Sequence, residues 1–183
     1  MQVAVQKIHG PQQFEEFDKT SAPFLAGNNI SKLLTQAGPY QRFVAAHQDD
    51  YGYKTKPATR IPAFALAVSM RDKDLGRSME TVLRAAALFG GFQIKIKLVE
   101  EKVGDISLVG YRFPEDPLPG DPTNVRFNFS PCFAVVGDQF IAASTLELGR
   151  EMIGLLQEEA KAPVKKSPIS ERTVFYSSGG ADY

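Results

Sequence analysis

The chain has 183 residues, of which 43% are hydrophobic and 23% are charged, close to the average for soluble globular domains. Its 21 Lys and Arg equal its 21 Asp and Glu, so no net charge is available to attract nucleic acid or an anionic membrane surface. We therefore expect no nucleic-acid partner. No apolar run reaches the roughly 18 residues of a membrane-spanning helix, so we expect no membrane insertion either.

Residues 11–48 predict an N-terminal part made of two or three short helices. Apolar residues recur there at spacings of three and four, with interruptions at Pro23, Gly27 and the Gly38-Pro39 pair. The residues that carry this pattern are Phe14, Phe17, Leu25, Ile30, Leu33, Leu34, Phe43 and Val44. Residues 1–10 lack the features of a signal peptide, and the polar segment 48–62 predicts a loop.

The next two segments predict a strand and a helix. Residues 63–70 form a short apolar run after Pro62, which is typical of a strand in the middle of a sheet. Asp72 or Asp74 can then cap a helix, and the Gly90-Gly91 pair predicts its end. One face of this helix is apolar and needs a sheet to cover it; it consists of Leu75, Met79, Val82, Leu83, Ala86 and Phe89.

Two hairpins follow the helix. Residues 94–98 alternate between apolar side chains and lysines, as a half-buried strand does, and a turn at Gly104-Asp105 leads to a second strand at 106–113. Residues 125–136 and 139–144 predict the other hairpin, with Pro131 at a strand start or bulge. Such short connections make the paired strands antiparallel.

The last predicted helix begins at Ser144, which with Glu147 fits a capping box, and ends near Lys161. The order of elements predicts an α+β fold, with an antiparallel sheet of about five strands built from hairpins and helices packed on one face. We expect a single domain over 1–160, with a helical part at 11–48 and a core at 62–160. Residues 161–183 predict a linker and tail that contain one strand-like run at 173–176.

Two loops contain the residues that could carry chemistry. His47, Asp49 and Asp50 offer an imidazole and two carboxylates, but a metal site needs at least three ligands that converge. Asp116 and Asp121 lie in the proline-rich loop 114–124, and their spacing does not match a calcium-binding loop. We therefore expect solvated loops, without a metal, a cofactor or an assigned catalytic residue.

Cysteine and aromatic residues give two further expectations. Cys132 lies in an apolar strand, so we expect a buried thiol and not a nucleophile activated by His9 or His47. Tyr51, Tyr53, Tyr111 and Phe113 predict an exposed aromatic surface for a protein partner. Two segments, at Asn29 and Asn128, match the glycosylation acceptor pattern by chance.

Four segments together resemble an uncharacterised group of large bacterial proteins, many of them planctomycetal and exported. They are PAFALAVSMRDKD, SMETVLRAAALF, KLVEEKVGDISLVGYRF and PCFAVVGDQFIAASTLELGREMIGLL. The resemblance covers about residues 11–160 and implies a modular parent protein, exported or in the cell envelope, built from tandem units of strand, helix, hairpins and helix. It implies no activity.

These observations favour a noncatalytic structural or interaction module, a segment of a larger bacterial protein. Its partner would be another protein or a neighbouring domain of the same parent chain. The alternative is a hydrolase-type enzyme that uses side chains of loops 47–53 and 114–124, because a rigid scaffold presents its chemistry on loops. A cleft where His47 meets several acidic groups would favour the enzyme, and a flat aromatic surface would favour binding.

Overall fold

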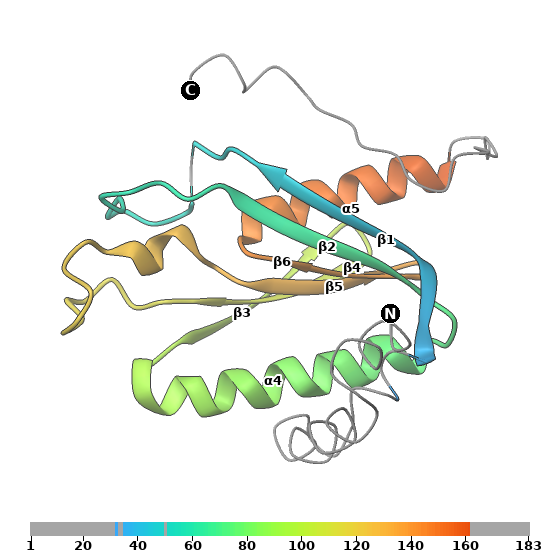
Figure 1. Ribbon diagram of the computed structural model, residues 1–183, viewed down its shortest axis with the longest axis horizontal. Coiled ribbons are helices and arrows are strands. Elements are labelled where there is room, and N and C mark those ends of the chain that lie inside the picture. The colour runs from blue at the N-terminus through green and yellow to red at the C-terminus, as the bar shows by residue number, and fades with distance from the viewer. Residues whose placement is uncertain (1–31, 33–34, 50, 162–183) are drawn as a thin grey trace, which may run out of the picture.

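The computed structural model describes residues 32, 35–49 and 51–161, with the side chains of 86–94 excepted (Figure 1). Most of the predicted helical part 11–48, including Asn29, lies outside these residues, as do His9, Asp50 and the strand-like run at 173–176. The described part forms a six-stranded antiparallel sheet with the strand order β1-β2-β6-β5-β4-β3. The strands are β1 (Ala37–Ala46), β2 (Ala63–Met70), β3 (Lys97–Val103), β4 (Ile106–Arg112), β5 (Cys132–Val136) and β6 (Gln139–Ala143). The predicted α+β class is confirmed.

The additional strand, β1, occupies a segment that the sequence predicted as helical. The prediction was wrong because Phe43 and Val44, adjacent apolar residues, belong to opposite faces of a strand and not to one face of a helix. Val44 packs against the buried core, whereas Phe43 is 71% exposed. The strand pairs with β2, about twenty residues further along the chain, and the local pattern contains no sign of that pairing.

The helices α4 (Asp74–Ile94) and α5 (Leu146–Lys161) lie on opposite faces of the sheet (Figure 1), so the prediction of helices on one face was wrong. The larger core lies under α5 and includes Leu148 and Ile153. A smaller cluster on the other face joins Phe133 and Phe140 to Met79 of α4. Most of β5 is buried on both faces, with Val135 the exposed exception, which explains why the strand is apolar along its whole length.

Two predicted boundaries shift for local reasons. α4 continues through Gly90-Gly91 to Ile94, and Lys95, with a φ of 55°, provides the left-handed residue after its end. β3 therefore begins at Lys97 and not at Ile94. Among the described residues, no helix combines the length and apolar composition needed to cross a membrane.

The segment 125–131 is not a strand, as the sequence predicted, but a connection into β5. Its first four residues, Val125–Asn128, form a 3₁₀ helix. Asn124 precedes it with a φ of 55°, a left-handed conformation that interrupts an extended chain. β5 then begins at Cys132, directly after Pro131, in agreement with the expected strand start.

The cap of α5 is Thr145 and not Ser144. The N–H of Leu148 donates to the Thr145 hydroxyl over 3.2 Å, which is the geometry of a helix N-cap. The Ser144 hydroxyl instead accepts a hydrogen bond from the backbone N–H of Phe64 in β2, at 2.9 Å. The predicted capping box is thus wrong by one residue, because Ser144 directly follows β6 and its hydroxyl is bonded to β2.

We expect Thr145→Val to lower the free energy of unfolding by about 1–2 kcal/mol. The substitution keeps the volume but removes the cap and the hydrogen bond that Thr145 donates to the buried Gln48 side chain, at 2.6 Å. Thr145→Ser is the control, because it keeps the hydroxyl and should retain most of the stability. Denaturant titration measures both, and equal losses would assign the effect to packing of the methyl group.

Candidate functional site

The two loops selected from the sequence lie against each other at one end of the sheet. Residues 47–62 connect β1 to β2, and residues 113–131 connect β4 to β5. The backbone N–H of Ala58 donates to the carbonyl of Thr123 at 2.9 Å. The Tyr53 hydroxyl donates to the carbonyl of Phe129 at 2.8 Å and accepts from the N–H of Phe113 at 3.1 Å. The structure therefore unites the loops that the enzyme alternative required.

Asn128 joins these loops from within. Its side chain is 1% exposed and accepts a hydrogen bond from the N–H of Ile61 at 2.8 Å. Its amide group donates to the carbonyls of Thr59, at 2.9 Å, and Val125, at 3.0 Å. In the folded protein this amide is inaccessible, so the glycosylation pattern at Asn128 has no functional meaning there.

Two acidic residues of loop 113–131, Asp121 and Glu115, bind groups of the protein itself. Asp121 accepts hydrogen bonds from the Arg126 guanidinium, at 2.6 Å, and from the N–H of Val125, at 2.8 Å. Partial burial disfavours the charged carboxyl, but these hydrogen bonds outweigh it and lower the pKa of Asp121 below its ordinary value. Glu115 accepts from the N–H groups of Lys54 and Thr55 at 3.4 and 3.3 Å. The carboxylates are therefore engaged in holding the loops.

His47 and Asp49 lie at the edge of the loops. Nδ1 of His47 is 3.8 Å from a carboxylate oxygen of Asp49, which also lies 3.9 Å from the Arg60 guanidinium. The Asp49 side chain is 93% exposed. In the part of the chain that the structure describes, no three His, Cys, Asp or Glu side chains are grouped as a metal site requires. The pair of His47 and Asp49 is a surface contact, and Asp116 and Asp121 do not join it.

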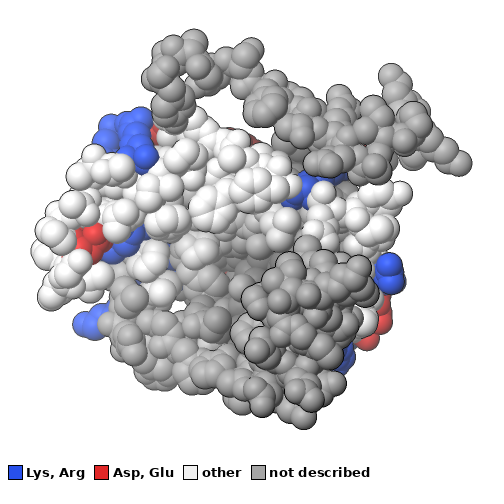
Figure 2. Space-filling view, viewed as in Figure 1, with Lys and Arg blue, Asp and Glu red and all other residues white. Residues whose placement is uncertain are grey.

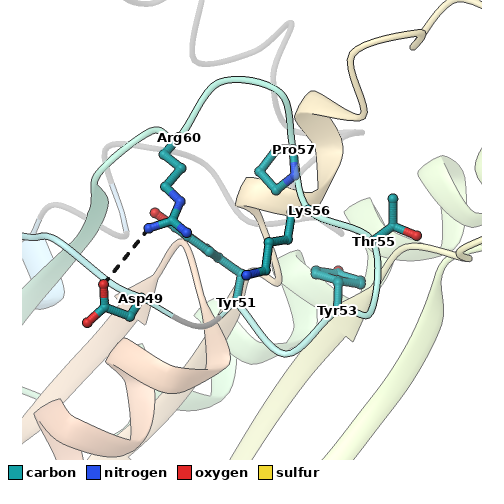
Figure 3. Close-up of a pocket in the computed structure, with 7 residues that line it drawn as sticks. All are labelled: Asp49, Tyr51, Tyr53, Thr55, Lys56, Pro57 and Arg60. Atoms are coloured by element: carbon teal, nitrogen blue, oxygen red, sulfur yellow. Dashed lines mark ion pairs between the residues drawn. The ribbon is translucent and has the colours of Figure 1, made fainter.

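A small hollow lies beside this pair, on loop 47–62 (Figure 3). Its volume of about 20 Å³ holds about one water molecule. Its walls are formed by Asp49, Tyr51, Tyr53, Thr55, Lys56, Pro57 and Arg60. The Tyr51 hydroxyl does not point into a binding site, because it donates to the carbonyl of Ile61 at 2.8 Å. The hollow brings one carboxylate and two cationic side chains together, but it has no room for a substrate.

The sequence prediction that Cys132 is buried is confirmed. The thiol is 4% exposed, lies under α5 and donates to the carbonyl of Thr145 at 3.2 Å. Burial, with a smaller contribution from the carboxylate of Glu147, raises the pKa of Cys132 to about 12. A thiol with this pKa stays neutral at physiological pH, and the thiolate is the form that attacks substrates.

We expect a thiol reagent to modify native Cys132 more than about 100-fold more slowly than the same residue in denatured protein, because both exposure and thiolate are lacking. Leu155→Cys is the matched control, since Leu155 is 55% exposed on the outer side of α5. The Leu155→Cys variant contains both cysteines, so mass spectrometry can measure the labelling rates at positions 132 and 155 in one sample. Equal rates at positions 132 and 155 would contradict a buried thiol.

The exposed aromatic surface differs from the one predicted. Tyr51 is buried, and Tyr53, Tyr111 and Phe113 are half-buried, so they form no exposed patch. The large apolar side chains exposed on β1 and β2 are instead Tyr40, 78% exposed, Phe43, 71%, and Phe64 and Leu66, 43% each. We call these four residues the β1–β2 surface.

The strand register explains why the β1–β2 surface is continuous apart from Tyr40, which lies within the shift of register between Ala37 and Gln41. Phe43 lies directly opposite Leu66, and Phe64 lies opposite Ala45, so Phe43, Leu66 and Phe64 share one face of the sheet. The smaller cluster beside α4 draws on β4, β5, β6 and Met70 at the end of β2, and it does not include these three side chains. In β2 the large residues alternate with Ala63, Ala65 and Ala67, whose small side chains face the core under α5. That alternation was the available sequence signal.

In comparisons with protein-family models, curated proteins and solved structures, no match to this chain was found. Function must therefore be inferred from the geometry of this chain. Two features are available for that purpose, the loop cluster around Asn128 and the β1–β2 surface.

Proposed function

We propose that the chain is a noncatalytic interaction module and that the β1–β2 surface contacts its protein partner. The observation that carries the proposal is the exposure of Phe43, Phe64 and Leu66 as direct neighbours on one face of the sheet. Contiguous exposed apolar side chains on a folded domain are typical of interaction sites. In keeping with the resemblance to large modular proteins, we place this module within a larger bacterial protein.

The composition of the surface favours a protein as the partner. Tyr and Phe are enriched in protein interfaces, and charged residues are depleted at their centres. Figure 2 shows that uncharged side chains make up most of the described surface where Figure 1 places β1 and β2. Arg42, the charged residue of β1, belongs to the other face, where it forms an ion pair with Glu159 of α5.

The loop cluster gives less support to the hydrolase alternative. A hydrolase requires a cleft in which an acid, a base or a nucleophile reaches a substrate. Here Glu115 and Asp121 hold the backbone and Arg126, and the Tyr51 and Tyr53 hydroxyls donate to carbonyls. The hollow beside Asp49 holds about one water molecule. These bonds serve to fix the two loops.

A photo-crosslinking amino acid at position 43 tests the proposal in cells that naturally produce the protein. We expect irradiation to give a discrete cross-linked product from position 43. The same group at position 155 is the control, because Leu155 is exposed on α5, beyond the opposite face of the sheet, and should give little product. No product from position 43, or equal products from both positions, would overturn the proposal.

A further inference from the structure

The β1–β2 surface lies on the face of the sheet that α4 covers only in part. Phe43 pairs with Leu66, and Leu66 pairs in turn with Ala142 of β6, so these three side chains share one face. On that face, Ala142 and Met79 of α4 pack against the cluster around Phe133. Six strands spaced by about 4.8 Å span about 24 Å, whereas one helix is about 10 Å wide. Among the described helices, α4 therefore leaves β1 and β2 uncovered on this face, in agreement with the exposure of Phe43 and Leu66.

The chain reaches β1 from the side of α4. Thr35 and Gln36 are helical, and the Thr35 hydroxyl donates to the carbonyl of Lys32 at 2.8 Å. The carbonyl of Gln36 accepts a hydrogen bond of 2.8 Å from the N–H of Arg71, and α4 begins shortly after Arg71, at Asp74. Figure 1 shows that the first residues of β1 bend away from the rest of the sheet toward the start of α4. The chain therefore enters the sheet on the face that carries the β1–β2 surface.

We propose that residues 11–31 of this chain cover the β1–β2 surface in the free module and that the protein partner replaces them there. The proposal rests on the proposed function, because it describes how access to the same surface is regulated. The sequence of the segment suits such a cover: apolar residues recur at helical spacings among charged ones, and the interruptions at Pro23 and Gly27 allow short helices. The apolar residues that would meet the surface are Phe14, Phe17, Leu25 and Ile30.

The segment is long enough to reach the surface. Phe43 lies about 20 Å along β1 from the first residue of the strand, Ala37, and a helix covers that distance in about 14 residues. Residues 11–31 exceed this length. Residues 162–183 are less suited as the cover, because they follow α5, which lies on the opposite face of the sheet (Figure 1).

Attachment to the same chain favours this segment over a separate molecule in the free module. A short tether holds a segment near its site at an effective concentration on the order of millimolar. The segment and the protein partner exclude each other, because both bury Phe43 and Leu66. If about nine in ten free molecules carry the cover, the apparent Kd for the partner rises about tenfold. Access to the β1–β2 surface is thereby controlled within the chain.

A photo-crosslinking amino acid at position 43 of the purified 183-residue chain tests the cover. We expect irradiation of dilute protein to join position 43 to a peptide within residues 11–31, which mass spectrometry identifies after proteolysis. Position 98 is the matched control: Leu98 is 51% exposed and pairs with Tyr111 of the α4 cluster, so it lies on the same face but at the other edge of the sheet. A link to residues 11–31 that is missing from position 43, or that forms equally from both positions, would overturn the proposal.

Substitutions within the segment provide a second test, with the labelling rate of Leu66→Cys as the readout. Phe14→Asp together with Phe17→Asp should weaken the cover, because carboxylates oppose burial against an apolar surface. We expect a thiol reagent to modify Leu66→Cys about tenfold faster in this variant than in the otherwise unchanged chain. Gln12→Asp together with Gln13→Asp is the control, since it adds the same charge and removes no apolar side chain. Far-ultraviolet circular dichroism confirms that the variants remain folded, and equal labelling rates in the two variants would overturn the cover.

The cover and the interaction module can fail separately. A link from position 43 to residues 11–31 without any partner product in cells, even from the Phe14→Asp, Phe17→Asp chain, would support the cover and overturn the interaction module. A partner product in cells without the internal link in purified protein would overturn the cover and support the interaction module. If both proposals hold, the partner product increases when the two phenylalanines are replaced. The absence of both products would overturn both proposals.

Discussion

Replacement of Asn128 by leucine is expected to lower the free energy of unfolding by about 3–5 kcal/mol. Leucine has the same branching as asparagine, although its methyl groups are larger, and it leaves the N–H of Ile61 and the carbonyls of Thr59 and Val125 without partners. Asn128 is 1% exposed, so water cannot easily replace the lost hydrogen bonds. Each unsatisfied buried polar group costs about 1–3 kcal/mol.

Asn124→Gly provides the control in the same loop. Asn124 has a φ of 55°, which glycine adopts readily, and its side chain makes a single long hydrogen bond to Arg126 at 3.3 Å. We expect its replacement to cost less than about 1 kcal/mol. Hydrogen exchange adds a local measurement, because the amide of Ile61 should lose protection in Asn128→Leu alone. A denaturation midpoint unchanged by Asn128→Leu would contradict the role of Asn128 as the link between the loops.

The sequence predicted best those elements whose apolar pattern is local. β2 was predicted with its observed bounds, and β4, β6 and the end of α5 within a residue, because strand alternation, turn residues and the helical spacing act over a few positions. Thr145 shows where this precision ends. The local pattern fits a cap at either Ser144 or Thr145, and the hydrogen bond of Ser144 to Phe64 in β2 decides between them.

Non-local contacts explain what the sequence did not predict. β1 is a strand because β2 pairs with it, and its exposed Phe43 resembles a core residue when the chain is read alone. Tyr51 was the converse, since a polar loop predicted exposure, but Tyr51 is 6% exposed and its hydroxyl donates to the carbonyl of Ile61, ten residues away. In the candidate site, both loops were predicted as loops, yet the role of Asn128 depends on groups 67 and 69 residues away along the chain. No local pattern carries that information.

Gly149→Ala is expected to lower the free energy of unfolding by about 2–3 kcal/mol, although alanine favours a helix over glycine by about 1 kcal/mol. A Cβ atom at this position in α5 would lie 2.5 Å from Sγ of Cys132 and 3.3 Å from a methyl group of Leu108. Both neighbours are buried, Leu108 completely, so neither can move into solvent. In Gly154→Ala, five residues further along the helix, the Cβ meets nothing within 4 Å, and we expect a gain of up to about 1 kcal/mol.

The nearest contact can be removed, which makes the cause of the Gly149→Ala effect measurable. Cys132→Ala deletes the Sγ atom and should by itself cost about 1–2 kcal/mol through the small cavity that it leaves. In that background, the new methyl group of Gly149→Ala occupies the space of the missing sulfur and retains its helical preference. We therefore expect the double variant to be more stable than the sum of the two single losses by about 1–2 kcal/mol. Strictly additive losses in denaturant titrations would show that the close approach of α5 to β5 at Cys132 is not what requires glycine at position 149.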